Sequence, residues 1–154
     1  MKRIKIAGAI LGCLLLLLII IAPVGPLPGF FIGGTATDAP EMWPDTSAVD
    51  EIQLRVAGTL PRVVVIWVID YQEELYIVGR SESTWVNMIG QAAPVEMRLD
   101  EKTYSLTASI LPEGWQPIMK AYVEKYQSDY PDIIAGLPAV EDAQGKIAVF
   151  KLSR

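Results

Sequence analysis

An uninterrupted apolar run near the N-terminus constrains this chain more than any other feature. The run IAGAILGCLLLLLIIIA fills residues 6–22, carries no charged side chain and is followed by Pro23. A helix needs about 20 apolar residues to cross the hydrocarbon core of a bilayer, and about 17 is near the lower limit. We therefore expect residues 1–22 to form an N-terminal membrane anchor, with one transmembrane helix that contacts lipid through residues 6–22.

A cleavable signal peptide is the alternative interpretation of this run. The apolar core of a signal peptide usually has about 7 to 15 residues and ends at a small-residue cleavage site. This run is longer and passes directly into PVGPLPGFFIGG. Cleavage within residues 35–39 stays open as the alternative to a retained anchor.

The charges that flank the run predict its orientation. Lys2, Arg3 and Lys5 precede it, whereas Asp38 and Glu41 are the first charged residues after it. Basic residues next to a first membrane segment remain on the cytoplasmic side. We therefore expect a single-pass membrane protein whose N-terminus is cytoplasmic and whose domain lies on the outer side.

Composition excludes two classes of partner. Apart from the three basic residues before the run, the chain has 10 basic and 18 acidic side chains. A surface that binds nucleic acid needs clustered Lys and Arg, so no nucleic acid partner is expected. The chain has no histidine, and its one cysteine, Cys13, lies inside the apolar run, where it is most simply a small apolar helix residue. No metal site is expected.

A Pro- and Gly-rich segment separates the run from the remainder of the chain. Five prolines and four glycines are spread over residues 23–50, and no periodic pattern survives among them. We interpret residues 23–50 as a spacer that holds the domain off the bilayer. Trp43 lies between two of the prolines and is a candidate for the bilayer surface, where tryptophan is favoured.

From residue 51 to residue 154 the pattern predicts one mainly β domain. Apolar and polar residues alternate with a period of two, which is typical of strands with one buried face. Strands are expected at residues 51–56, 63–70, 75–78, 95–99, 103–110 and 146–152.

The second of these strands differs from the others. The sequence VVVIWVID, residues 63–70, is apolar on both faces, so it must be covered twice. Its second cover is either a helix of the same chain or a partner chain. A monomer that left this face open would expose an unusually large apolar patch, which favours a homodimer.

Two helices are expected among the strands. The first covers about residues 84–90, with Ser83 as its N-cap. The second spans about residues 115–126, where Pro117 occupies the first turn and apolar residues recur at helical spacing. Mostly antiparallel strands with few helices indicate a small α+β barrel.

Several blocks of the domain resemble the split-barrel flavin-binding superfamily, the group around pyridoxamine 5'-phosphate oxidase and the deazaflavin-dependent nitroreductases. These blocks are VVVIWVID, EELYIVGRSESTWVNMIG, APVEMRL and KTYSLTASI. The resemblance implies a six-stranded split β-barrel. It also implies a homodimer with FMN or a deazaflavin at the subunit interface.

The resemblance assigns the cofactor phosphate to one turn. A guanidinium, hydroxyl groups and free N–H groups at the start of a helix are groups that bind anions, and they converge between residues 79 and 85. Glu82 and the absence of a second basic residue count against this assignment. Arg80 is otherwise an ordinary solvated charge, and Ser83 an ordinary N-cap. The predicted cofactor-binding residues are Arg80, Ser81, Ser83, Thr84 and Trp85.

Two functions therefore stay open. The chain is either a membrane-anchored, oxidoreductase-like protein that binds FMN or a deazaflavin, or a cofactor-free barrel that acts as a membrane-tethered binding or assembly module. No nucleophile stands next to a base, so the sequence designates no catalytic residue and does not decide whether the protein is an enzyme.

The retained anchor makes a direct prediction. Because residues 6–22 span the bilayer, the full-length protein should stay in the membrane fraction after a wash with alkaline carbonate. Release of the intact domain, or a mature N-terminus near Thr37, would show that the segment is not a retained anchor.

Overall fold

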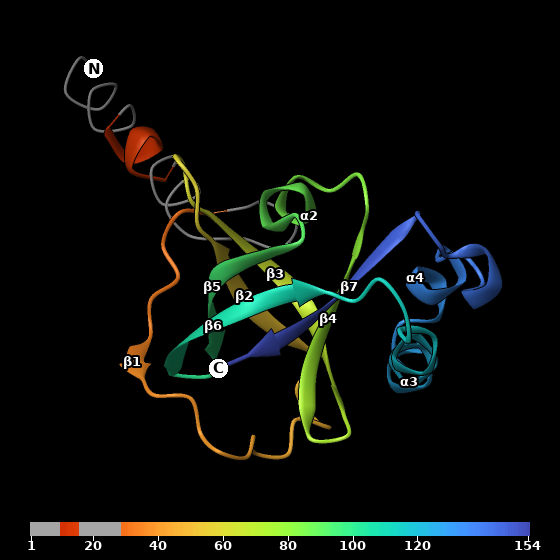
Figure 1. The fold of residues 1–154 in the computed structure, drawn as a ribbon. Coiled ribbons are helices and arrows are strands. Elements are labelled where there is room, and N and C mark those ends of the chain that lie inside the picture. The colour runs from red at the N-terminus through yellow and green to blue at the C-terminus, as the bar shows by residue number, and fades with distance from the viewer. Residues whose placement is uncertain (1–9, 16–28) are drawn as a thin grey trace.

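The computed structural model describes residues 10–15 and 29–154 (Figure 1). Within these residues, the six strands and two helices expected from the sequence are all present in the expected order. The elements are β1 (Thr35–Thr37), β2 (Glu51–Val56), β3 (Arg62–Tyr71), β4 (Glu74–Arg80), α2 (Thr84–Ile89), β5 (Ala92–Leu99), β6 (Lys102–Ile110), α3 (Gln116–Tyr126), α4 (Pro131–Ala135), the 3-10 turn η1 (Val140–Asp142) and β7 (Ile147–Ser153).

The strands β2 to β7 close into a six-stranded antiparallel barrel within the described part of the chain. Their order is β6-β5-β2-β3-β4-β7, and β7 pairs back onto β6. The open edge of β6 is divided between two partners, because β1 pairs with Lys102–Tyr104 and β7 with Thr107–Ile110. The predicted mainly β barrel is confirmed.

The period-two pattern explains the core of the barrel. Alternate side chains of each strand point to the interior, and the inward ones include Leu54, Val68, Ile77 and Phe150, each fully buried. The short helix α2 covers one opening of the barrel and inserts Trp85. Its ring packs so closely on β4 that a Cβ at Gly79 would lie 2.2 Å from it.

The second face of β3 is covered by α3 of the same chain. The ring of Trp67 stacks on that of Tyr126, with centroids 4.2 Å apart and planes 13° from parallel. The Tyr126 hydroxyl accepts a hydrogen bond from the Val68 N–H at 3.1 Å and lies 2.6 Å from the Val68 carbonyl oxygen. The predicted second cover of β3 is therefore confirmed as a helix, and the homodimer stays a prediction.

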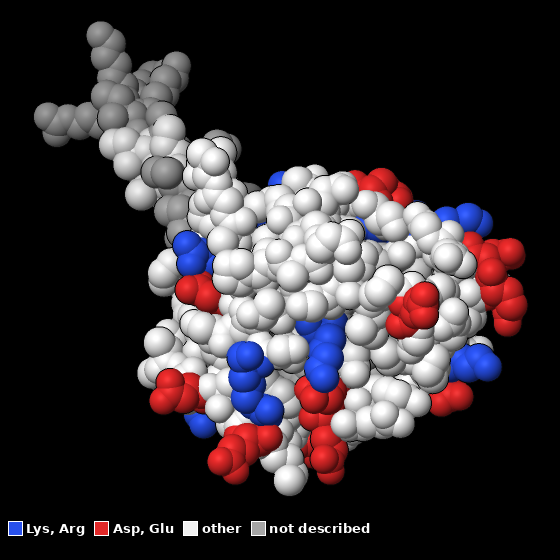
Figure 2. All heavy atoms as spheres, in the orientation of Figure 1, with Lys and Arg blue, Asp and Glu red and all other residues white. Residues whose placement is uncertain are grey.

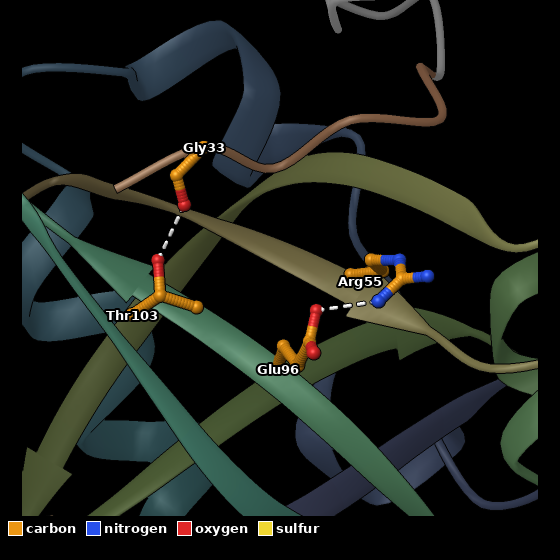
Figure 3. A network of polar contacts seen from close by, with 4 residues as sticks. All are labelled: Gly33, Arg55, Glu96 and Thr103. Carbon is orange, nitrogen blue, oxygen red and sulfur yellow. Dashed lines mark hydrogen bonds and ion pairs between the residues drawn. The ribbon is translucent and has the colours of Figure 1, made fainter. Parts of the chain in front are cut away.

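Residues 29–50, which we call the strap, correct the prediction of a spacer. Gly29 exchanges both backbone hydrogen bonds with Val63, at 2.9 and 2.8 Å. The Thr103 hydroxyl donates to the Gly33 carbonyl at 2.6 Å (Figure 3). Trp43 is 6% exposed, with its ring 5.2 Å from that of Tyr104, so it does not face a bilayer. Prolines and glycines limit regular structure in this segment to the short strand β1, but they do not prevent its apolar side chains from packing on the barrel.

None of the helices in the described part of the chain is long and apolar enough to cross a bilayer. The predicted anchor lies outside the described residues except for residues 10–15, which are helical.

The contact between α2 and β4 predicts a sensitive position. Replacing Gly79 with alanine places a Cβ against Trp85 and Val86, and overpacking of this kind costs about 1 to 3 kcal/mol. Gly79→Ala should lower the free energy of unfolding by that amount in urea titrations followed by circular dichroism. Gly136→Ala is the control, since the atom nearest to its added Cβ would be a carbonyl oxygen 3.3 Å away. Equal stability of the two variants would contradict the packing described.

The tyrosines of α3 predict how stability depends on alkaline pH. Burial raises the pKa of Tyr122 and of Tyr126 above the ordinary tyrosine value, which is about 10. The unfolded chain therefore loses these protons before the folded chain does, and stability falls as the pH rises above about 10. Phenolate absorbance should show a late step that coincides with loss of the circular dichroism signal. Ionisation of all tyrosines in one step, with the fold intact, would contradict this account.

Candidate cofactor site

The predicted phosphate turn connects the end of β4 to α2. Arg80 is the last residue of β4, and the Ser83 N–H donates to its carbonyl at 2.9 Å, which closes the turn. Ser83 is the N-cap residue in an extended conformation, and its side chain makes no capping hydrogen bond. The backbone carbonyl of Ser83 accepts a hydrogen bond from the side-chain amide of Asn87 at 3.1 Å. The hydroxyl of Ser83 thus makes no hydrogen bond to the first turn of the helix.

The charge of Arg80 is only loosely compensated. Its side chain is 63% exposed, and its Nη1 lies 3.8 Å from Oε1 of Glu82. An exposed ion pair of this length contributes little, so the guanidinium remains accessible to an anion. Ser81 is half-buried beside it and Thr84 is exposed. Four of the five predicted residues thus lie together at the surface of one turn.

Trp85, the fifth predicted residue, lies elsewhere. Its side chain is 9% exposed and packs inside the barrel, with its ring 5.9 Å from that of Phe150. The structure thus places its ring in the interior of the barrel, and its contact with a phosphate stays a prediction. The indole packs α2 onto the barrel and so helps to fix the turn that precedes this helix.

The backbone of a second basic residue, Lys146, lies next to the turn because β4 pairs with β7. Arg80 pairs with Ile147 in the register of β4 and β7, and the Ser81 N–H donates to the Lys146 carbonyl at 3.0 Å. The Lys146 side chain is exposed. Sequence reasoning missed this residue, because only the pairing of β4 with β7 brings positions so distant in the sequence together.

A cavity of about 350 Å³ opens beside this turn; we call it the α2 cavity. Its walls come from α2, the end of β6, the segment before α3 and the start of β7. The described residues that line it include apolar and polar uncharged side chains but no charged one. The main apolar ones are Val86, Ile110, Leu111, Trp115, Ile147 and Val149, and the polar ones are Ser81, Asn87, Gln91 and Gln144.

The outer face of β2, β5 and β6 carries a different polar group. Arg55 and Glu96 form an ion pair at 2.7 Å (Figure 3), and clefts of about 350 and 370 Å³ adjoin it. The Arg55 guanidinium is thus already neutralised. Arg154, which lines one of these clefts, donates to the Glu41 carbonyl of the strap at 2.6 Å. The guanidinium groups of Arg55 and Arg154 already have partners within the protein. The α2 cavity with its turn is therefore the better candidate for a ligand.

Comparison with known sequences leaves the chain without an assigned family. No family model matches it, and no curated protein matches it either.

Several solved structures are similar to this chain. A protein described as general stress protein 26 from Jannaschia sp. CCS1 aligns with a TM-score of 0.51 at 7% identity, over 70% of this chain and 67% of that one. The FAD and heme binding protein from Mycobacterium smegmatis aligns with a TM-score of 0.49 at 12% identity, over 70% of this chain and 62% of that one. A NimC/NimA family protein from Clostridium acetobutylicum aligns with a TM-score of 0.46 at 18% identity, over 66% of this chain and 72% of that one.

Identities this low concern the fold alone and carry no activity from one protein to another. The six-stranded barrel closed by β7 and the fold shared with the protein from Jannaschia agree with the resemblance noted in the sequence. The chain has the split-barrel fold.

Proposed function

We propose that this chain is a membrane-anchored split-barrel protein that binds FMN or a deazaflavin. The ring system would lie in the α2 cavity, and the phosphate at the turn that carries Arg80, with Lys146 of the adjacent segment beside it. The observation that carries the proposal is the position of the cavity directly beside that turn, with Ser81 belonging to both. In this proposal residues 6–22 anchor the protein and the domain lies on the outer side.

The groups of the turn fit a phosphate. Guanidinium and ammonium groups form charge-assisted hydrogen bonds with phosphate oxygens, and Arg80 and Lys146 supply one of each. Ser81, Ser83 and Thr84 add hydroxyl groups that can donate to the same oxygens. Glu82 is the opposing feature, because its carboxylate repels an anion. The Glu82 carboxylate also competes with a phosphate for the Arg80 guanidinium. This competition is weak, since the two side chains are 3.8 Å apart and both are exposed.

The cavity fits a planar ring. Ligand sites are mostly apolar hollows of about 300 to 1,000 Å³ with a few polar groups, and the volume of about 350 Å³ is at the lower end of that range. Trp115 and the aliphatic residues supply apolar walls. The amides of Asn87, Gln91 and Gln144 supply donors and acceptors for the polar edge of a flavin or deazaflavin ring.

A bound flavin or deazaflavin would supply hydride transfer, and the protein would supply binding, orientation and exclusion of water. The turn holds the phosphate and the cavity walls shield one part of the ring. No side chain of the described residues is assigned a proton-transfer step.

A cofactor-free barrel is the second candidate. The observations that favour it are Glu82 in the turn and the lack of charged side chains among the described residues that line the cavity. Under this alternative the anchored domain serves as a binding or assembly module, and the cavity takes no phosphorylated ring.

Titration of the detergent-solubilised full-length protein with FMN and with a deazaflavin tests the proposal. Arg80→Ala removes a hydrogen bond to a charged group, which is worth about 1.5 kcal/mol at the low end that suits an exposed side chain. That loss weakens binding roughly tenfold. Lys146→Ala should weaken binding in the same direction. Lys102→Ala, at the far end of the barrel, is the matched control and should leave the affinity unchanged.

Three outcomes separate the alternatives. Weakening by Arg80→Ala and Lys146→Ala, but not by the control, supports the site. Cofactor binding that neither variant changes moves the site away from the turn. No binding of either cofactor at high micromolar concentration leaves the cofactor-free module.

A further inference from the structure

We propose that the outer face of β2, β5 and β6 binds a neutral oligosaccharide in a groove beside the strap. Three clefts of about 350, 500 and 370 Å³ adjoin one another there, because each pair of clefts has at least one lining residue in common. We call the three together the strap groove. The described residues that line it include none of those that line the α2 cavity, so the inference goes beyond the proposed cofactor site and does not depend on it.

Strand register forms the floor of the strap groove. Arg55, Glu96 and Ser105 are cross-strand neighbours on β2, β5 and β6. Side chains two residues apart on a strand share a face, so Thr103 and Thr107 flank Ser105 on this same side of β6. The serine and Thr107 are exposed, and Thr103 is half-buried. A row of three hydroxyl groups thus extends about 13 to 14 Å along β6.

The strap and the C-terminus form the walls of the groove. The Thr103 hydroxyl donates to the Gly33 carbonyl at 2.6 Å, which fixes the strap along one side of the floor (Figure 3). Next to this contact, Phe31 lines the groove and is 65% exposed. Arg154 lines another part of the groove and is held by its hydrogen bond to the Glu41 carbonyl. In Figure 1 the groove lies on the side of the barrel that carries β1.

The charges of the groove favour a neutral ligand. Two basic side chains line it, Arg55 and Arg154, and two acidic ones, Asp38 and Glu96. Arg55 and Glu96 neutralise each other at 2.7 Å, yet the side chain of each is 36% exposed. Figure 2 shows basic and acidic side chains interspersed on the visible face, without a large patch of either sign. The ion pair that makes this face a poor site for an anion leaves it open to an uncharged polar molecule.

The groups that line the groove match those of a sugar. A pyranose ring carries neighbouring hydroxyl groups, each of which both donates and accepts hydrogen bonds. The Arg55 guanidinium supplies donors, the Glu96 carboxylate supplies acceptors, and the hydroxyls of Ser105 and Thr107 supply both. The C–H groups on the less polar side of a sugar ring pack on the negative face of an aromatic ring. Phe31 presents such a ring beside these polar groups.

An extended peptide is the other class of ligand that long grooves bind. Peptides either add a strand to an open sheet edge or insert side chains between apolar and aromatic walls. The centre of the floor has no open edge, because β5 pairs with both β2 and β6. Its central residues, Arg55, Glu96 and Ser105, are polar and do not suit an apolar anchor side chain. These observations favour a saccharide over a peptide.

Saturation-transfer NMR on the full-length protein tests the inference, in a detergent without a sugar headgroup. The probes are oligosaccharides of glucose, of mannose and of N-acetylglucosamine, together with a proline-rich peptide. Thr107→Val removes one hydroxyl at nearly constant volume and should weaken sugar binding roughly two- to tenfold, the range of one neutral hydrogen bond. Phe31→Ala removes the stacking ring and should weaken it at least as much. The matched controls are Thr59→Val and Leu60→Ala, both exposed and outside the groove.

Sugar binding that both groove variants weaken, and that neither control changes, supports the inference. Equal binding by all variants would overturn it by moving the sugar away from the groove. No transfer to any of the three oligosaccharides at millimolar concentration would overturn it as well, and transfer to the peptide alone would do so in favour of a peptide groove. Added FMN should leave sugar binding unchanged, and displacement of the sugar by FMN would overturn the inference by placing the sugar in the α2 cavity.

Discussion

The structure depends on the insertion of its last strand between two others. β7 pairs with β4 from Leu75↔Leu152 to Arg80↔Ile147, and with β6 from Thr107↔Ser153 to Ile110↔Phe150. This double pairing removes the open sheet edges and buries Phe150 completely. The same register fixes the candidate site, because it sets Ile147 opposite Arg80 and brings Lys146 to Ser81. The site is therefore formed by the closure of the barrel, and no single segment could form it alone.

The fold could be predicted well from the sequence because its signals are local. Strict alternation over β2, β5 and β6 requires only that one face of each strand is buried. Pro117 in the first turn marks the start of α3 by the chemistry of one residue. The apolar VVVIWVID run predicted a second cover for β3, but it could not distinguish α3 from a partner chain. That distinction needed the stacking of Trp67 on Tyr126, a contact between residues far apart in the sequence.

The candidate site could be predicted only in part, for the same reason. Arg80, Ser81, Ser83 and Thr84 are neighbours in the sequence, so a local pattern brought them together. Lys146 and the walls of the α2 cavity come from distant segments, whose register no local pattern reveals. Trp85 was expected beside the phosphate because of the family resemblance. The absence of a side chain at Gly79 lets its indole enter the barrel instead.

The strap changes how the domain relates to its anchor. Lys125 of α3 donates from Nζ to the carbonyls of Thr46, Val49 and Val68 at 3.1, 2.7 and 3.0 Å. One ammonium group therefore joins the strap, β3 and α3. Prolines and glycines in this segment favoured a free spacer on local grounds, but its carbonyls and apolar side chains find partners on the barrel. The folded unit thus includes residues 29–50 and does not begin at residue 51.

The central claim is that the α2 cavity and its turn hold a flavin or a deazaflavin. The visible absorption spectrum of the purified full-length protein tests it most directly, before and after incubation with each cofactor and removal of the excess. The account predicts a cofactor absorption band that stays with the folded protein and is released by denaturation. A protein without visible absorbance, which also retains neither cofactor after incubation, would contradict it.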